Sequence, residues 1–563
     1  MRLPAYLLAV LGLLLSAAGD AHALDAPATR TEARTRLQHL AQSARHPDLR
    51  WPVFSDFRSD VEQLYGRADW LPLWLERQRP TEAAIQLIAR LAAADSLGLD
   101  PEDYDADWLT RTAGELAIRH APPTADVEAR FDLALAVAAV RFVRALNVGR
   151  VSPGVVDAQV FVPIQPRIAA LEVDSLRDAG LQAGVLQRVQ STFHHYQLLK
   201  NGLARYRMLA RDTTLALVDV LPRDLQPGMP LPCAARLRHL LEATGDMIPA
   251  KQRPEADADT LYVADLVGGV KQFQRRHGFE PDGWIYAETA DALGRPFEQH
   301  VRQIALALER WRWLPMSAAS PPIIVNIPAF QLYAFRGLID REDEMLAMDV
   351  LVGAAFRHET PVFAADMAYV IFRPYWEIPA DIQLYELGPM ALTDRANLER
   401  LGYVLVKSGA EDAPPLPLTP QNIKRIGHDL RMRQLPGEYN ALGLVKFMLP
   451  NIHDVYLHDT PVKGMFAFSR RDISHGCIRV SDPVGLAAHV LANQPGWTPD
   501  RIRQAMEGKD DNVRVDLAAP VPVYILYATA VVGENGESYF YSDVYGLDRK
   551  LDELLKKGYP YPR

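Results

Sequence analysis

The sequence has little cysteine and, beyond its first residues, no long uncharged apolar run. Only two cysteines, Cys233 and Cys477, occur in 563 residues. They fall in different predicted domains, so we expect two free thiols and not a disulfide framework. Residues 3–18 form the one apolar stretch that approaches membrane-spanning length. Membrane contact is therefore expected only through this N-terminal segment.

Basic tracts are also lacking, and the formal net charge is -9. No run of lysine and arginine could follow a phosphate backbone, which argues against nucleic-acid binding. The sequence shows no metal-ligand constellation and no glycine-rich phosphate loop, so neither a metal nor a cofactor is expected. The hydrophobic fraction of 48% and the charged fraction of 23% are those of an ordinary globular protein.

The N-terminus has the pattern of an export signal. Arg2 precedes the apolar stretch, and Ala21-His22-Ala23 fits a cleavage site between small residues. We predict that residues 1–23 are a signal peptide or an uncleaved anchor, and that the mature chain is exported.

The chain is too long for one core, and its two halves differ in pattern. Apolar residues recur at helical spacing in 83–94 and 131–146, so residues 24–228 are predicted to be a helical scaffold domain. Short helical faces then mark a compact module. The predicted units that follow are the module at 229–298, a linker helix at 299–318, a β domain at 319–510 and a C-terminal strand and tail at 511–563 that packs on the β domain.

Strand signals dominate the second half. Residues 323–328 and 331–335 flank a short turn, which predicts a hairpin. Further strands are expected at 349–353, 369–372, 456–458, 478–480 and 521–532. The fold class is thus multidomain α+β, with a mostly antiparallel β domain. Residues 382–433 are charged and read as a helical insertion, and such an insertion commonly serves as a lid.

The stretch 472–480 has the composition of a reactive site. In an extended segment His475, Cys477 and Arg479 would project to one side. The thiol would then lie between two potential cations, which lower a thiol pKa from its usual value of about 8.5. Gly476 leaves the backbone open to a substrate.

A nucleophilic cysteine needs a base, and His458 is the nearest upstream candidate. Alternation in 455–461 would place Tyr456 and His458 on one face and apolar residues on the other. From spacing alone a second interpretation stays open, in which the histidines are structural and Cys477 is a small buried side chain.

His458, followed after fifteen residues by Ser474-His475-Gly476-Cys477-Ile478-Arg479, resembles the signature of the L,D-transpeptidase (YkuD) family, whose members remodel bacterial peptidoglycan. The flanking sequence is similar to the large Gram-negative, YcbB-like branch over nearly the whole mature chain. The motifs that carry this likeness are Gly437, 440–443, Lys446-Phe447, Pro450-Asn451 and 456–461.

The resemblance implies a periplasmic enzyme that crosslinks peptidoglycan and thereby affects wall organisation and cell shape. Cys477, deprotonated by His458, would attack the carbonyl that joins diaminopimelate to D-alanine in a tetrapeptide donor. The thioester would be resolved by the diaminopimelate amine of an acceptor stem. Carbapenems would acylate the same cysteine. Other wall-synthesis enzymes are possible partners.

The resemblance also implies roles for neighbouring residues. Backbone N–H groups near Gly476 and Cys477 would bind the oxyanion, and the Asp459 carbonyl would fix the His458 tautomer. His475 would orient the loop or help to hold the thiolate. Substrate contacts are expected from Tyr456, Arg479, Ser474 and Trp376, with a structural role equally open for Arg479. Arg373 stands where the family more often has asparagine.

The run 270–278 with Asp282-Gly283 resembles the three-helix peptidoglycan-binding module. Gly268-Gly269 would lie inside a helix, where glycine costs up to about 1 kcal/mol relative to alanine. A spacer that no longer binds the wall is therefore the alternative for this module.

Three other functions are alternatives to transpeptidation. A cysteine hydrolase, either an L,D-carboxypeptidase or an enzyme of lipoprotein attachment or release, would share the acyl-enzyme and differ only in what resolves it. A non-catalytic wall-binding protein would not need His458 and Cys477 together. A papain-like protease would carry its cysteine before its histidine, and the order here is the reverse.

Overall fold

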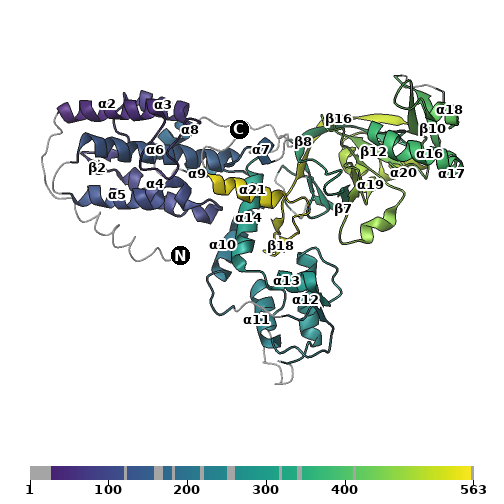
Figure 1. Cartoon of the computed structure of the whole chain (residues 1–563), viewed down its shortest axis with the longest axis horizontal. Coiled ribbons are helices and arrows are strands. Elements are labelled where there is room, and N and C mark those ends of the chain that lie inside the picture. The colour runs from purple at the N-terminus through teal and green to yellow at the C-terminus, as the bar shows by residue number, and fades with distance from the viewer. Residues whose placement is uncertain are drawn as a thin grey trace.

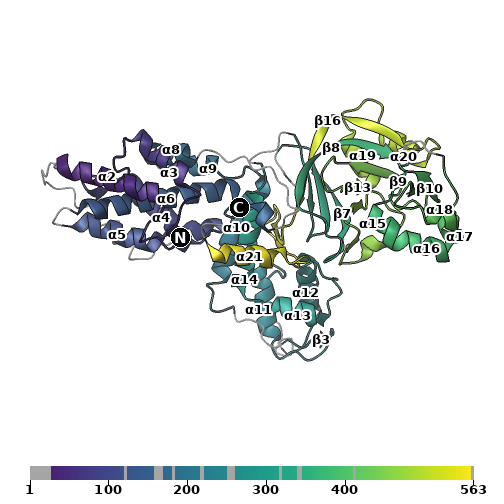
Figure 2. The same cartoon turned by 45° about the horizontal axis from the view of Figure 1, so that its top comes forward.

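The computed structural model describes residues 27–119, 123–156, 169–179, 184–215, 221–249, 260–315, 320–338, 341, 345–409 and 414–558. The predicted signal segment 1–23 lies outside them. Figure 1 shows an elongated chain with a helical part at one end, a β-rich part at the other and a small helical module beside their junction. The turned view in Figure 2 preserves this arrangement.

The N-terminal part is a helical bundle built around one long helix, α6 (Ala125–Val148). The Thr124 side chain caps its first turn, and Gly149 ends it with a φ of 81°. Residues on every side of α6 are buried, which is typical of a helix at the centre of a bundle. Around it lie α2 (Pro27–Ser43), α3 (Arg58–Arg67), α4 (Glu82–Ala92), α5 (Ala106–Ile118), α7 (Pro153–Val156), α8 (Ala169–Ala179), α9 (Val185–Arg188) and the short elements β1 (Leu75–Glu76), β2 (Arg79–Pro80), η1 (Ala94–Leu97) and η2 (Pro101–Tyr104).

A buried carboxylate organises the aromatic side chains of this bundle. Tyr65 donates its hydroxyl to Asp132 at 2.6 Å and stacks on Trp70 with ring centroids 5.9 Å apart. Asp132 also accepts the backbone N–H groups of Leu73 and Trp74 at 2.9 and 2.7 Å. Burial raises the pKa of Asp132 to about 6, although these donors favour its charged form. Tyr65 and Trp74 are core residues, and Trp70 is partly buried against the same core.

The module comprises β3 (Asp224–Leu225), α11 (Ala234–Thr244), α12 (Ala264–Arg276), β4 (Ile285–Tyr286) and α13 (Ala287–Leu293). The Gly268-Gly269 pair does lie inside α12. A Cβ on Gly269 would come 2.4 Å from Met247 Cγ, so close packing of α12 on its neighbour requires glycine there. No atom lies within 4 Å of a Cβ on Gly268. Close packing therefore explains the glycine at position 269, despite its cost inside a helix, but it does not explain the glycine at position 268.

The module shares a core with its neighbours. Its buried leucines cluster with those of α10 (His194–Leu209) and α14 (Phe297–Trp311) and with side chains of the β domain. Arg276 forms a buried ion pair with Asp246 and donates to the Ser538 carbonyl. The module is thus joined to the rest of the chain by packed and charged contacts.

The β domain is a nine-stranded sheet in the order β14-β7-β15-β13-β12-β8-β16-β5-β6, and β6 also pairs with β7, which closes the sheet on itself. The pairings are mixed, with β13–β15, β14–β7 and β16–β5 parallel and the others antiparallel. The strands are β5 (Ile323–Asn326), β6 (Gln331–Phe335), β7 (Met345–Gly353), β8 (Phe363–Phe372), β12 (Val445–Met448), β13 (Leu457–His458), β14 (Asp472–Ser474), β15 (Ile478–Val480) and β16 (Val513–Leu526); α19 (Pro483–Val490), α20 (Pro499–Glu507) and η7 (Lys463–Ala467) complete the domain.

The end of the chain differs from the prediction in two ways. Residues 521–532 do not form one strand, because β16 ends at Leu526 and Ala530–Val532 forms β17, which pairs with β18 (Ser538–Phe540) instead. The final helix, α21 (Leu547–Lys557), packs its leucines into the scaffold core. The tail was expected to pack on the β domain. Its amphipathic pattern could not specify which apolar surface it would cover.

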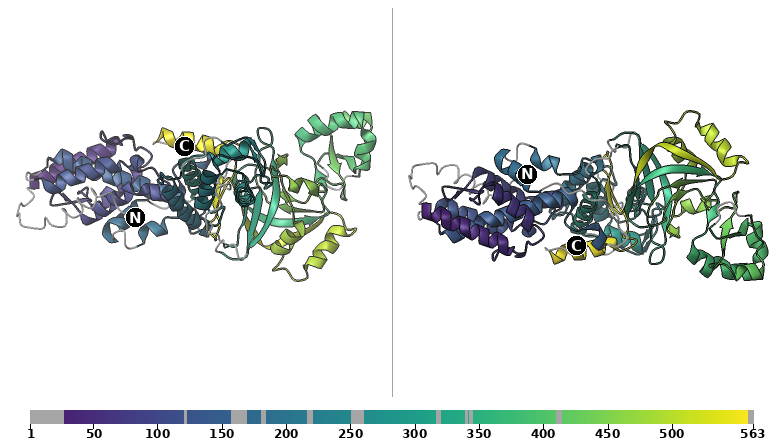
Figure 3. Two further views of the ribbon diagram at one scale, coloured as in Figure 1. Left: turned by 90° about the horizontal axis from the view of Figure 1, so that it is seen from below. Right: turned by 90° about the horizontal axis from the view of Figure 1, so that it is seen from above.

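The insertion was predicted to be helical, but it contains both helices and strands. It comprises β9 (Trp376–Glu377), α15 (Ala380–Ile382), the π-helix η6 (Gln383–Leu387), α16 (Gly388–Thr393), α17 (Arg395–Arg400), β10 (Tyr403–Lys407), α18 (Pro420–Ile423) and β11 (Leu430–Gln434). Its strands form a separate sheet, β10-β11-β9, over a core of their own. Figure 3 shows the unit projecting from the β domain at the end remote from the scaffold.

None of the helices within the described residues is both long enough and apolar enough to cross a membrane.

Candidate active site

The chain reverses direction at the predicted nucleophile. β14 runs parallel to β7 and β15 runs antiparallel to it, so the intervening residues 475–477 form a bend. Gly476 has a φ of 109°, which side-chain-bearing residues rarely adopt. The segment is not extended, so the alternation that predicted a common face for His475 and Cys477 does not hold across this bend. His475 is exposed and lies 3.1 Å from Glu386 of the insertion instead.

Strand pairing places the predicted base on the strand beside the one that directly follows the predicted nucleophile. β13 and β15 are parallel neighbours in which Leu457 pairs with Ile478 and His458 with Arg479. Leu457 and Ile478 are fully buried on the core side. Because alternate residues face opposite sides, Tyr456, His458, Cys477 and Arg479 share the other face. Burial on one side of the sheet thus fixes the register that assembles the site.

Tyr456 and two cations surround the thiol. Cys477 is partly exposed, and its S–H donates to the Asp454 carbonyl at 3.7 Å. Burial raises the thiol pKa above its ordinary value, while hydrogen bonds from the Tyr456 backbone and hydroxyl and the charges of Lys446 and Arg479 oppose the rise. The prediction of a lowered thiol pKa is therefore wrong, because the effect of burial is larger than that of these groups.

His458 is buried and neutral. Burial, together with the charge of Arg479, lowers its pKa to about 3. Its Nδ1 lies 2.5 Å from the Asp459 carbonyl, so the N–H is on Nδ1 and Nε2 is left as a proton acceptor. Asp459 is itself fixed, because its carboxylate accepts the Leu444 N–H at 2.9 Å and pairs with Lys463.

Ser474 and Gly476 build the bend. The buried Ser474 hydroxyl donates to the Cys477 carbonyl at 2.7 Å and accepts the Gly476 N–H at 3.2 Å. Ser474 therefore shapes the loop, and the substrate contact expected of it does not fit its burial. The Gly476 N–H is engaged by this hydroxyl, which leaves the Cys477 N–H as the better oxyanion donor.

The predicted substrate contacts Tyr456, Trp376 and Arg479 lie around Cys477. The Trp376 side chain interacts with the Tyr456 hydroxyl and packs edge-on against Tyr403. Arg479 has a buried Nε with no hydrogen-bond partner among the described residues, and it is electrostatically coupled to Cys477. A substrate carboxylate is a suitable partner for such a group.

Lys446 is a site residue to which the sequence analysis gave no role. It pairs with His458 across β12 and β13, and its ammonium lies 4.7 Å from the centre of the Tyr456 ring. Burial lowers its pKa. Alternation with the buried Phe447 was the signal that could have placed it on the catalytic face.

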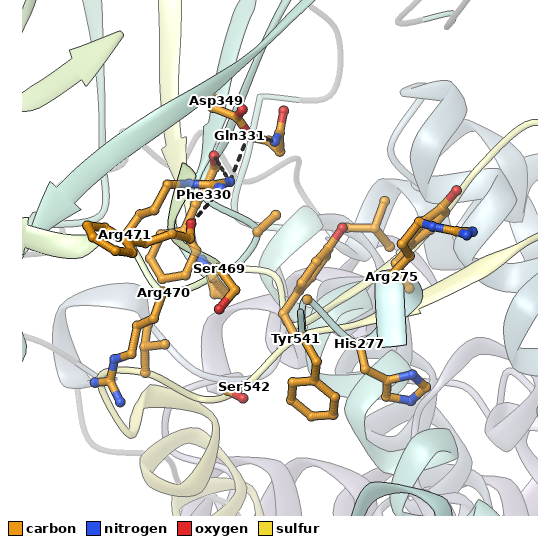
Figure 4. Close-up of a pocket in the computed structure, with 18 of the residues that line it drawn as sticks. Arg275, His277, Phe330, Gln331, Asp349, Ser469, Arg470, Arg471, Tyr541 and Ser542 are labelled. Atoms are coloured by element: carbon orange, nitrogen blue, oxygen red, sulfur yellow. Dashed lines mark hydrogen bonds and ion pairs between the residues drawn. The ribbon is translucent and has the colours of Figure 1, made fainter. Parts of the chain in front are cut away.

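A cavity of about 620 Å³ lies apart from the thiol. Figure 4 shows Arg275 and His277 of the module on one side and Arg470 and Arg471 of the β domain on the other. Arg471 is held by the Phe330 carbonyl and by Asp349 at 3.1 and 2.8 Å. Further lining comes from Gln331, Phe468 and Tyr541. Both aromatic faces and hydrogen-bonding groups are therefore available there.

Two segments of the chain match models of known protein families. Residues 321–522 match the family model of the L,D-transpeptidase catalytic domain (YkuD), and residues 59–203 match that of a scaffold domain. A Haemophilus influenzae protein named "Putative L,D-transpeptidase" is 30% identical over 262 residues, which are 46% of this chain. The matched part spans about half of that relative, 51% of its length. The chain therefore contains a segment similar to the YkuD L,D-transpeptidase catalytic domain, which follows a segment similar to a scaffold domain.

Proposed function

We propose that this protein is an exported, periplasmic L,D-transpeptidase that forms diaminopimelate–diaminopimelate crosslinks in peptidoglycan. The observation that supports this most directly is the shared face of Cys477 and the neutral His458, imposed by the β13–β15 register. A buried neutral imidazole beside a thiol is suited to accept the thiol proton as the sulfur attacks a carbonyl.

Before substrate reacts, the Cys477 thiol and the His458 imidazole are both neutral. The first step must therefore include a proton transfer between them. The Cys477 proton passes to Nε2 of His458 while the sulfur bonds to the diaminopimelate carbonyl carbon. The carbonyl oxygen becomes an oxyanion that accepts the Cys477 N–H. Collapse breaks the bond to D-alanine, and the imidazolium returns its proton to the departing amine. A thioester and a neutral His458 remain.

The second step reverses these roles with a new nucleophile. The side-chain amine of an acceptor diaminopimelate gives a proton to His458 and attacks the thioester carbonyl. Sulfur leaves as a thiolate, which Tyr456, Lys446 and Arg479 stabilise, and His458 then reprotonates it. The product is a peptide bond between two stems.

Water could resolve the same thioester, which keeps an L,D-carboxypeptidase or lipoprotein-processing hydrolase as the alternative. Two contacts of the insertion favour the transferase. Glu386 hydrogen-bonds His475, and Trp376 reaches Tyr456. An insertion that contacts both His475 and Tyr456 can restrict water near the acyl-enzyme.

We further propose that the module at 229–298 binds the wall and that the 620 Å³ cavity at its edge is where glycan docks. Aromatic faces such as Tyr541 suit the apolar side of a sugar ring, and Arg275 and Gln331 suit its hydroxyl and amide groups. If the module were only a spacer, Arg275→Ala at this cavity would leave sedimentation with isolated sacculi unchanged.

The deciding experiment is incubation of the purified protein with a disaccharide tetrapeptide, followed by mass analysis. Crosslinked dimer with release of D-alanine is expected from the wild type, and none from Cys477→Ala. His458→Ala should retain only a trace. Cys233→Ala is the matched control and should retain full activity, because this buried thiol lies in the module. Trimmed monomer without dimer would establish the hydrolase instead.

Carbapenem treatment tests the nucleophile separately from the substrate. A strained β-lactam carbonyl should acylate Cys477 and give one adduct by intact-protein mass spectrometry. Cys477→Ala should give none, and Cys233→Ala should behave as the wild type. An adduct on Cys477→Ala would place the reactive group elsewhere.

A further inference from the structure

Three potential metal ligands from distant parts of the chain meet at the catalytic bend. They are His358 in the loop after β7, Glu386 in the π-helix of the insertion, and His475 beside Gly476. Their donor atoms all lie within 4.8 Å of one another. Sequence spacing gave no sign of this cluster, because each ligand comes from a different segment.

We propose that His358, Glu386 and His475 bind a divalent transition-metal ion, with Zn²⁺ the best fit, and that the ion fastens the insertion to the catalytic loop. Two imidazoles and one carboxylate form a ligand set that zinc commonly takes, with a fourth position open to water. All three side chains keep contact with solvent, so the ion has an entry path.

The distances suit closure around an ion. His475 Nε2 already lies 3.1 Å from Glu386 Oε1, and the two imidazole rings are 4.8 Å apart at 46°. Zinc bonds of about 2.0–2.2 Å in a tetrahedron place ligand atoms roughly 3.3 Å apart. The His475–Glu386 edge has nearly that length. A small side-chain rotation of His358 would complete the set.

The two histidines are carried by loops that one hydrogen-bond network holds together. Thr360 accepts the Gly353 N–H at 2.8 Å and donates to the Gly476 carbonyl at 2.7 Å. Ala354 donates its N–H to the Ser474 carbonyl at 2.9 Å and accepts that of His358 at 3.0 Å. Fixing both backbones limits the conformational cost of assembling the ligands.

The carboxylate is positioned by the π-helix Gln383–Leu387. The side chain of Gln383 donates to the Ile378 carbonyl at 2.5 Å and accepts the Met432 N–H at 2.6 Å. These bonds tie the helix carrying Glu386 to both flanks of the insertion. An ion held by Glu386 and the histidines would therefore restrain the insertion as a unit over the approach to Cys477.

Isothermal titration of Zn²⁺ into Cys477→Ala tests the site, since this variant removes the catalytic thiol as a competing ligand. One saturable site is expected. Adding His358→Ala or Glu386→Gln should weaken binding at least ten-fold. The control is His428→Ala, which removes an exposed histidine of the same insertion. It should bind as the parent does, and melting temperatures should show that all variants fold.

Hydrogen exchange supplies a second readout that does not depend on turnover. Zn²⁺ should slow exchange in residues 383–387 of the Cys477→Ala protein several-fold and leave exchange unchanged in the Glu386→Gln variant. Equal affinities in all variants, or no saturable binding, would show that Glu386 and His475 form only a hydrogen bond. Both experiments use the inactive Cys477→Ala protein and measure no turnover. A negative result would therefore contradict the metal site alone and would not bear on the proposed transpeptidase activity.

Discussion

Replacing Tyr456 with phenylalanine isolates one contribution to the nucleophile. The hydroxyl hydrogen-bonds the Cys477 sulfur, and burial keeps its own pKa well above the ordinary value, so it stays a donor. A hydrogen bond to a charged group contributes about 1.5–3 kcal/mol. At about 1.4 kcal/mol per pKa unit, its loss should raise the thiol pKa by roughly 1–2 units.

The assay is the rate of iodoacetamide alkylation as a function of pH, followed by intact-protein mass in a Cys233→Ala background. Below the thiol pKa, Tyr456→Phe should react roughly 10- to 100-fold more slowly than its parent, because only the thiolate attacks. Tyr403→Phe is the matched control, since this ring packs against Trp376 and its hydroxyl is not among the groups that act on the thiol pKa. Superimposable pH profiles for Tyr456→Phe and its parent would refute the proposed stabilisation of the thiolate by the hydroxyl.

Two other substitutions test stability and positioning. His300 is buried against Phe540 and burial lowers its pKa to about 3, so its contribution to stability is present above pH 6.5 and lost as the pH falls from 6.5 to 3. His300→Phe cannot protonate, and its melting temperature should fall less than that of the wild type between pH 7 and 5; an equal fall would exclude His300 as a source of acid sensitivity. A Cβ on Gly443, whose φ is 61°, would come 2.4 Å from the Asp459 side chain, which should shift the carbonyl that holds His458. Gly443→Ala should therefore lose at least ten-fold in kcat while remaining folded by circular dichroism, and unchanged kcat would show that this carbonyl does not set the orientation of the base.

Helical and strand periodicity predicted the elements that bury one continuous face. The long helix around 131–146 and the hairpin of 323–335 were found because their apolar residues repeat at the period of the element. Alternation also placed Tyr456 and His458 on the same face. That prediction held because Leu457 on the other side is fully buried, which fixes the register.

The predictions were wrong where the local sequence pattern does not determine which other part of the fold a segment contacts. Alternation failed at His475 because Gly476 adopts a positive φ and turns the chain. The charges near Cys477 predict a lowered thiol pKa, but burial, which depends on the whole fold, has the larger effect and raises it. The strands β10 and β11 of the insertion were read as part of a helical segment, since each is short and pairs only within a small sheet.

The position of α21 constrains the order in which the molecule can fold. Its leucines Leu551, Leu554 and Leu555 belong to the core formed by the helices at the start of the chain. Asp548 and Asp552 add ion pairs to α14. A nascent chain thus exposes the scaffold long before the helix that completes its core has been synthesised. The β domain consequently lies, in sequence, between two parts of one hydrophobic core. Docking α21 on that core closes a long loop of chain, and this closure has an entropic cost.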